Sequence, residues 1–93
     1  MTLKVVWTTK FKRDYKRAMK RGLDINRLDQ VIRTLAAGEE LASSHRDHAL
    51  GGDWRGHREC HVQPDWLLIY YVDGERLVLP LTRTGTHADL FGL

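Results

Sequence analysis

The chain has 93 residues, of which 42% are hydrophobic and 29% charged, and its formal net charge is +3. This length predicts one domain, residues 1–93, with a single core, and the ordinary apolar fraction argues against a disordered chain. No apolar run approaches the roughly 20 residues of a membrane helix, the start at Met1 does not resemble a secretory leader, and the lone Cys60 cannot form an internal disulfide, so we expect a cytoplasmic protein.

Residues 3–21 predict a strand and then a basic amphipathic helix. The opening LKVVW is short, apolar and β-branched, as in a strand. Thr8 or Thr9 can cap a helix that reaches about residue 21, and Gly22 can stop it. The apolar stripe of this helix, expected to face the core, consists of Phe11, Tyr15, Ala18 and Met19. The opposite arc carries seven cations: Lys10, Lys12, Arg13, Lys16, Arg17, Lys20 and Arg21.

A second helix is expected after a short link. Asp24 can cap this helix and Gly38 can end it. Its apolar stripe consists of Ile25, Leu28, Ile32 and Leu35. Because the link is short, the two helices are expected to form an antiparallel hairpin.

The second half of the chain predicts a β-meander. Residues 39–53 are polar and lack periodicity, so they are expected to form a loop. Three strands are expected, joined by Pro-Asp and Asp-Gly turns, at about residues 54–62, 66–72 and 76–83. Pro80 lacks a ladder donor and predicts a bulge or an edge-facing position, and residues 85–93 are too few for a helix of consequence. The order β-α-α-β-β-β predicts a two-layer α+β fold, with a helical hairpin on one face of a small, mostly antiparallel sheet.

Alternation along the strand at 54–62 predicts which side chains face the helices. The more apolar set, expected beneath the helices, is Trp54, Gly56, Arg58, Cys60 and Val62. The set expected on the open face is Arg55, His57, Glu59 and His61.

Charge is distributed unevenly along the chain. Residues 1–33 contain ten Lys or Arg and three Asp, a net charge of +7, whereas the remaining sixty residues carry −4 and all five histidines. A solvated helix face is the common explanation of such a charge run. Seven cations with a single acid, Asp14, favour contact with a polyanion. We therefore expect one part of the molecule to hold a polyanion and another to act on it.

Three histidines in separate segments suggest proton-transfer chemistry. His48 lies in the loop, His61 near the end of a strand and His87 in the tail. Histidine accepts and donates protons near neutral pH. Together with Asp65 and Arg83, these residues could cleave RNA without a metal: one group removes the proton of a ribose 2′-hydroxyl, another protonates the departing 5′-oxygen, and arginine stabilises the negative charge.

A metal site is the main alternative. His57, Cys60, His61 and Asp65 are possible ligands, but alternation separates Cys60 from both histidines, and no CxxC or HExxH pattern occurs. We therefore expect neither a metal nor a cofactor. Trp66 more often belongs to a core than to a stacking site.

The second half of the chain resembles a known toxin family. RDHALGGDWRGHRECHVQPDWLLIYYV at 46–72 and RTGTHADLFG at 83–92 keep the order and spacing of motifs of the YafQ branch of the RelE-type bacterial toxins. The motifs are DH-x-L-x-G-x-W-x-G-x-R, H-V-x-P-D-W-x-L-I-Y and R-T-G-T-H-x-x-L-F-G. The N-terminal half is similar to the family in layout and basic character.

This resemblance implies the toxin of a type II toxin–antitoxin pair. Such toxins have a microbial-ribonuclease-like fold and cut messenger RNA in the ribosomal A site without a metal. Their basic helices bind ribosomal RNA, which implies a role for the cations of residues 10–21. A dimeric, DNA-binding antitoxin neutralises the toxin, in a heterotetrameric or larger complex that binds operator DNA.

The resemblance also implies a set of site residues. The catalytic residues are expected to be His48, His61, Asp65 and His87, with His48 or His61 as the base and His87 as the acid. The substrate-binding residues are expected to be Arg83 as a phosphate clamp, Phe91 as a stacking residue and Trp66, which would help to position the site. Glu59 stands where a shorter aspartate is usual in the family. Two alternatives stay open: an inactive homologue that binds ribosome or antitoxin, and a ribosome-independent ribonuclease.

Overall fold

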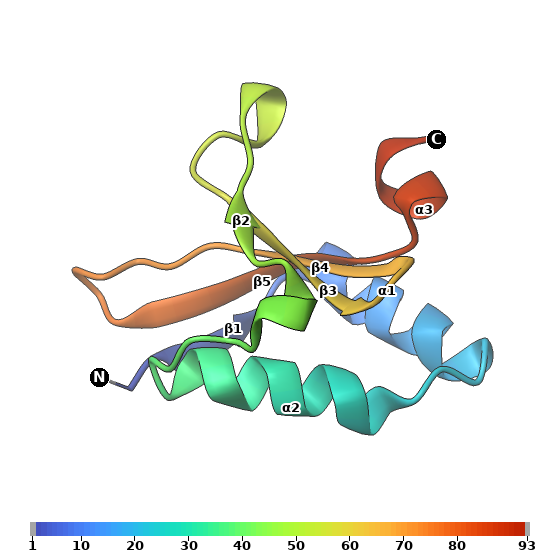
Figure 1. Ribbon diagram of the computed structural model, residues 1–93, viewed down its shortest axis with the longest axis horizontal. Helices are drawn as coiled ribbons and strands as arrows, with labels where there is room; N and C mark the ends of the chain where they lie inside the picture. Colours follow the sequence, from blue (N-terminus) through green and yellow to red (C-terminus); the bar gives the residue numbers. More distant parts are fainter. Residues whose placement is uncertain (1, 93) are drawn as a thin grey trace.

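A computed structural model of the chain describes residues 2–92 (Figure 1). The elements are β1 (Lys4–Trp7), α1 (Thr9–Lys20), α2 (Ile25–Ala36), η1 (Ser43–His45), β2 (His48–Ala49), η2 (Gly52–Trp54), β3 (Arg58–Gln63), β4 (Trp66–Tyr70), β5 (Val78–Gly85) and α3 (His87–Phe91). The opening strand and the two long helices are confirmed, with Thr8 and Asp24 as their caps. None of the helices between residues 2 and 92 is long and apolar enough to cross a membrane.

The five strands form one sheet in the order β1-β5-β4-β3-β2. β3, β4 and β5 make the predicted antiparallel meander, and β1 pairs with β5 in parallel. The strand expected from residue 54 begins only at Arg58, because residues 52–54 form the 3₁₀ turn η2 and Gly56 takes a positive φ of 88°. The expected loop also contains β2, which lengthens the sheet at the β3 edge.

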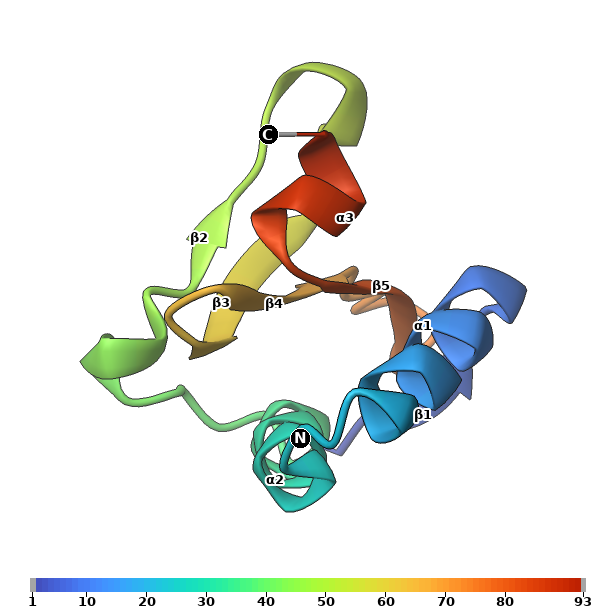
Figure 2. The same cartoon turned by 90° about the vertical axis from the view of Figure 1, so that its right-hand side faces the viewer.

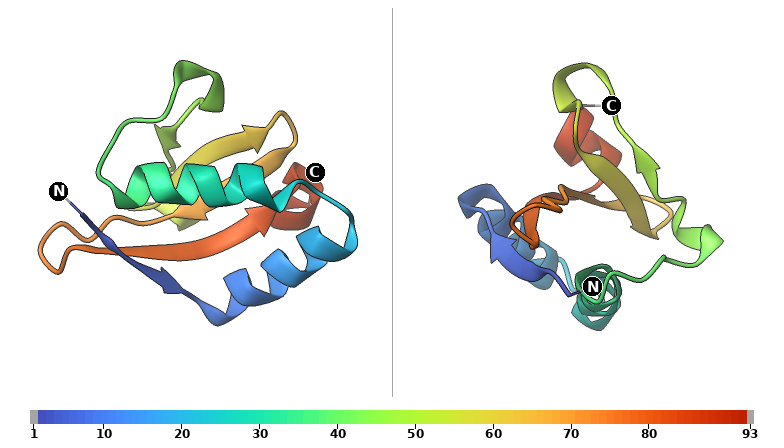
Figure 3. Two further views of the ribbon diagram at one scale, coloured as in Figure 1. Left: turned by 90° about the horizontal axis from the view of Figure 1, so that it is seen from below. Right: turned by 90° about the vertical axis from the view of Figure 1, so that its left-hand side faces the viewer.

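Helices cover one face of the sheet, while the opposite face carries the η2 loop and α3 (Figures 1 and 2). The two long helices lie on the same side, as predicted, but diverge from their connection instead of packing along their lengths (Figure 3). The Tyr15 hydroxyl donates to Asp29 Oδ1 at 3.1 Å and so joins the two helices.

The core lies between the helices and the sheet. All five residues of β4 are buried, as expected for a central strand, and Phe11 and Leu28 are fully enclosed. The predicted stripe of α1 is wrong at Met19, which is 57% exposed. Asp14 is buried instead, because its carboxylate accepts hydrogen bonds from β5.

Two predictions for the C-terminal part of the chain need correction. Pro80 lies neither on an edge strand nor in the bulge, which falls between Leu81 and Arg83. Pro80 lies opposite Tyr71, just beyond the end of β4, so the N–H that proline lacks removes no hydrogen bond from the β4–β5 ladder. The Pro80 carbonyl still accepts the Tyr71 N–H. The tail was expected to lack a substantial helix, but it forms the five-residue helix α3, which a capping box at Thr86 starts.

Candidate active site

Three histidines from separate segments converge on the open face of the sheet. His48 lies on β2, His61 on β3, and His87 begins α3. The ring centroids of His48 and His61 are 6.5 Å apart, and those of His61 and His87 are 5.8 Å apart. Phe91, one turn further along α3, has its ring 6.4 Å from that of His87. These three histidines, hereafter the histidine cluster, and Phe91 therefore lie together as the proposed site requires.

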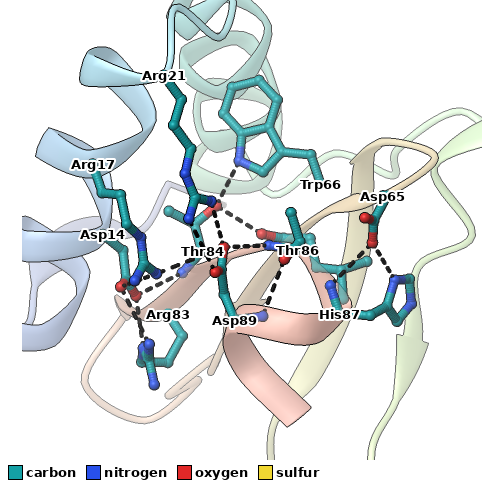
Figure 4. A network of polar contacts seen from close by, with 11 residues as sticks. Asp14, Arg17, Arg21, Asp65, Trp66, Arg83, Thr84, Thr86, His87 and Asp89 are labelled. Atoms are coloured by element: carbon teal, nitrogen blue, oxygen red, sulfur yellow. Dashed lines mark hydrogen bonds and ion pairs between the residues drawn. The ribbon is translucent and has the colours of Figure 1, made fainter. Parts of the chain in front are cut away.

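Asp65 holds His87 from the turn between β3 and β4 (Figure 4). Asp65 Oδ1 accepts the backbone N–H of His87 at 3.0 Å and the ring Nδ1–H at 2.6 Å. The backbone hydrogen bond, followed by the ring hydrogen bond, holds the pKa of Asp65 below its ordinary value. Because a carboxylate can only accept, Nδ1 carries a proton and Nε2 is the nitrogen left for chemistry.

Backbone carbonyls hold the rings of His48 and His61 through Nδ1, as Asp65 holds that of His87. His48 Nδ1 donates to the Arg46 carbonyl at 2.6 Å, and His61 Nδ1 donates to the Pro64 carbonyl at 3.1 Å. The two Nε2 atoms approach the same carboxylate oxygen, Oε1 of Glu59, at 3.6 and 3.7 Å. The Glu59 side chain is only 7% exposed, so little water screens its charge from the two rings. Glu59 therefore belongs to the site.

A metal ion could be held in the same place by a different set of ligands from those considered on sequence. Glu59, His61 and His87 each offer one ligand atom, and these atoms lie within 4.8 Å of one another. Imidazole and carboxylate suit zinc or copper. Cys60 is fully buried beneath the helices, on the face that alternation predicted, and is no part of this set.

Arg83 is held by a buried carboxylate. Its Nε and Nη2 donate to Asp14 at 2.6 and 3.2 Å, and the side-chain hydrogen bond to Asp14 raises the pKa of Arg83. Asp14 also accepts from the Arg17 side chain at 3.0 Å. In Figure 4 this group lies beside α1, whereas His87 lies at the opposite side of the view. The structure does not bring the expected phosphate clamp to the histidine cluster, and a role there would require its release from Asp14.

Trp66 cannot contact a substrate directly. It is 2% exposed and packs in the core beneath the helices. Its indole N–H donates to Thr84 Oγ1 at 3.0 Å, and the Thr84 hydroxyl donates to the Leu67 carbonyl at 2.7 Å. Trp66 therefore forms a structural contact between β4 and β5, next to Asp65 in the sequence. Its burial argues against direct substrate binding, and its role in positioning the site stays a prediction.

The basic face of α1 divides into two parts. Arg17 and Arg21 turn towards acids, with Arg21 Nη1 2.6 Å from Asp89 Oδ2 and Arg17 Nη2 3.0 Å from Asp14 Oδ1. Within residues 2–92, the other five cations make no ion pair with a carboxylate: Lys10, Lys12, Arg13, Lys16 and Lys20.

Sequence reasoning missed Asp89, which joins α3 to α1. Both nitrogens of the Arg21 fork donate to this carboxylate, at 2.6 and 3.2 Å, and the Thr86 N–H donates to it at 3.0 Å (Figure 4). The hydrogen bond from Arg21 is the main cause that holds the pKa of Asp89 far below its usual range. A sequence signal existed, because Thr86-x-x-Asp89 has the spacing of a capping box.

Trp54 was also missed, because it was assigned to the wrong face. Its ring lies 6.2 Å from that of Phe91 at 82° and 5.5 Å from that of His57 at 88°, so it packs edge-on against both. Figure 2 shows α3 beside the η2 loop that carries this tryptophan. The error follows from the late start of β3, which removes residue 54 from the strand.

Comparison with known proteins gives a consistent result. The family model described as the bacterial toxin of type II toxin–antitoxin system, YafQ, matches residues 3–92. The mRNA interferase toxin YafQ of Escherichia coli is 39% identical over 89 residues, which cover 95% of each chain. The E. coli DinJ–YafQ toxin–antitoxin complex contains a chain that is 38% identical, with a TM-score of 0.90, covering 99% of this chain and 100% of that one. A copper-bound mutant toxin from Helicobacter pylori is 39% identical, with a TM-score of 0.90, and covers 97% of this chain and 100% of its own.

Proposed function

Because this chain belongs to the YafQ family of bacterial toxins of type II toxin–antitoxin systems, we propose that it is an endoribonuclease, an mRNA interferase, whose catalytic centre is the histidine cluster. The observation that carries this proposal is the convergence of His48, His61 and His87 from three distant segments. Each ring is held through Nδ1, and Asp65 supplies the acceptor for His87. Such an arrangement supplies separate proton acceptors and donors within one site.

The proposed reaction uses the Nε2 atoms of the three histidines, because their Nδ1 atoms are held by hydrogen bonds. Nε2 of His48 or His61 removes the proton from a ribose 2′-hydroxyl, and the 2′-oxygen attacks the adjacent phosphorus. The bond from phosphorus to the 5′-oxygen breaks, which leaves a 2′,3′-cyclic phosphate. His87, protonated on both nitrogens, gives its Nε2 proton to the departing 5′-oxygen. The Glu59 carboxylate faces both candidate bases and stabilises the imidazolium that forms.

Other surfaces would place the message in this site. Phe91 stacks on a base beside His87, which tolerates any base because every base has a π-face. The five cations of α1 that make no ion pair with a carboxylate of residues 2–92 contact ribosomal RNA, whose phosphates they attract without regard to sequence. We therefore expect cutting to occur in the ribosomal A site, and to require no metal.

The partners follow from the same proposal. The E. coli relative is described in complex with the DinJ antitoxin. We expect this chain to have a cognate antitoxin, in a heterotetrameric or larger complex that binds operator DNA. Because its targets, messenger RNA and ribosomes, are cytoplasmic, so is the toxin.

Expression of the wild type and of the His87→Ala variant, followed by mapping of message 5′ ends, tests the proposal. New 5′ ends within translated codons are expected with the wild type and are expected to disappear with the variant. Ribosome binding without cutting by the wild type would instead favour the inactive homologue. Equal cutting of naked RNA would favour a ribosome-independent ribonuclease.

A metal-dependent reaction is tested separately, because Glu59, His61 and His87 could hold an ion. Cleavage is expected to persist in a chelator of transition metals that leaves Mg²⁺, and hence the ribosome, intact. Loss of cleavage that added zinc or copper restores would contradict the metal-free mechanism.

A further inference from the structure

A positively charged cleft lies next to the histidine cluster. It has a volume of about 510 Å³ and lies between α2, η1 and the end of β3. Two arginines from separate elements line it, Arg27 of α2 and Arg46 after η1, together with two histidines, His45 and His61. Its remaining lining residues are Ser44, Val62, Gln63 and Pro64, so no carboxylate from the described residues 2–92 lines it.

The cleft is connected to the catalytic groups by direct contacts. His61 belongs both to the cluster and to the lining of the cleft. The Arg46 carbonyl accepts from His48 Nδ1 at 2.6 Å, and His45 Nδ1 donates to the His61 carbonyl at 2.6 Å. His61 therefore lies between the catalytic groups and this cleft.

The guanidinium groups of the cleft are available, unlike those of Arg17, Arg21 and Arg83. Among the carboxylates of residues 2–92, Arg27 pairs only with Asp24, at 3.6 Å, and both side chains are more than half exposed, so this pair is weak. Within residues 2–92, Arg46 makes no ion pair with a carboxylate. A guanidinium with free N–H groups binds a phosphate bidentately.

We propose that this cleft binds a backbone phosphate of the message, next to the phosphate that is cut, with Arg27 and Arg46 as its cationic ligands. The proposal rests on the proposed function, because it assigns a subsite to the same RNA. It also gives the site a cation that Arg83, held by Asp14, does not provide.

The Arg27→Ala variant tests the subsite, and Arg33→Ala is its matched control. Arg33 is also an exposed arginine of α2, but it does not line the cleft. Single-turnover cleavage on ribosomes with a message in the A site gives a half-saturating toxin concentration and its salt dependence. Arg27→Ala is expected to raise that concentration about tenfold and to reduce the slope of log affinity against log salt by about 0.7, the value for one phosphate contact on a single strand. Arg33→Ala is expected to change neither, and Arg27→Lys is expected to keep most of the slope.

The source of the phosphate is tested on ribosomes with an empty A site. Arg27→Ala is expected to bind these as the wild type does, because the cleft holds message. A loss of binding there as large as on programmed ribosomes would assign the phosphate to ribosomal RNA and overturn the proposal. Equal effects of Arg27→Ala and Arg33→Ala, with both variants folded by thermal melting, would also overturn it. Undiminished cutting by His87→Ala would count against the proposed function instead, so the two failures are distinguishable.

Discussion

At the scale of single residues, the three histidines differ in the oxygen that holds them. His48 and His61 donate from Nδ1 to backbone carbonyls, whereas His87 donates to the carboxylate of Asp65. A carboxylate stabilises a protonated ring more than a neutral carbonyl does. This difference supports the assignment of His87 as the acid.

Asp65→Asn should separate orientation from charge. The amide oxygen can still accept from His87, but the negative charge that stabilises the imidazolium is lost. We expect the maximal cleavage rate to fall on the order of 10- to 100-fold, with little change in the half-saturating toxin concentration. A pH profile of single-turnover cleavage is the measurement, and an unchanged profile would remove Asp65 from the mechanism.

Trp54→Ala should weaken the position of Phe91. The edge-on contact between these rings contributes about 0.5–1.5 kcal/mol, so cleavage should fall up to about tenfold. Trp54→Phe should restore most of the activity, because it keeps an aromatic edge. If the two variants cleaved equally badly in the same assay, support of Phe91 would not be the role of Trp54.

At the scale of elements, α3 depends on contacts made by few side chains. The capping box of Thr86 and Asp89 starts it, Asp65 holds its first residue, and Arg21 joins it to α1. Because α3 carries His87 and Phe91, a loss of these contacts should affect chemistry before it affects the core.

Gly85→Ala should disturb α3 by steric conflict. A Cβ at this position would lie 2.9 Å from Asp89 Oδ2 and 3.0 Å from Asp89 Cβ, so the carboxylate must move. We expect a loss of about 1–3 kcal/mol in unfolding free energy and a larger proportional loss of cleavage than of ribosome binding. Gly74→Ala is the control, since nothing lies within 4 Å of a Cβ there. Equal losses in the two variants, by chemical denaturation and by cleavage, would contradict this account.

The ion pair of Asp89 predicts a pH dependence of stability. The pKa of Asp89 is lowered in the folded state, so the pair contributes fully above the ordinary aspartate pKa of about 3.9 and is lost as the pH falls below it. The melting temperature of Asp89→Asn should therefore lie below that of the wild type at pH 7, with the gap narrowing as the pH falls below about 4 and part of it remaining at pH 2. Asp53→Asn, at an exposed residue, should show no gap. A gap for Asp89→Asn that is constant with pH would exclude the electrostatic explanation.

At the scale of the whole molecule, cations on α1 and chemistry on the open face of the sheet occupy different surfaces. Lys12→Ala and Lys16→Ala should each weaken ribosome binding and lower its salt slope by about 1, without altering the cleavage rate at saturation. Lys4→Ala, an exposed lysine on β1, is the control. Ribosome binding is measured by sedimentation at several salt concentrations. If all three variants bound alike, the proposed role of the basic face in ribosome binding would be contradicted.

The periodicity of apolar residues in the sequence predicted correctly those helices and strands that bury one face and expose the other. The two long helices, the meander and the burial of Cys60 followed from it. The predicted apolar stripe of α1 failed at two residues: Asp14 is buried and Met19 is exposed. Asp14 is buried because Arg83 of β5 donates to its carboxylate, and helical spacing cannot predict such a partner. Trp54 was misplaced because the η2 turn and the positive φ of Gly56 delay the start of β3 to Arg58.

The predicted convergence of the three histidines is seen in the structure, whereas Arg83 does not join them. Their meeting depends on the order of strands, which the motifs of the resemblance carried. Arg83 was chosen for its charge and its place in a motif, and Trp66 for its place in a motif. Their partners, Asp14 and Thr84, are set by packing between distant segments.

The pairing of β1 with β5 joins residues more than seventy positions apart, and α3 follows β5 directly. The histidine cluster therefore cannot form until a growing polypeptide has reached residue 87 and emerged far enough from its own ribosome to pair these strands. A chain whose synthesis stalls earlier lacks both His87 and Phe91. If the proposed site is correct, incomplete copies that end before residue 87 are expected not to cleave message.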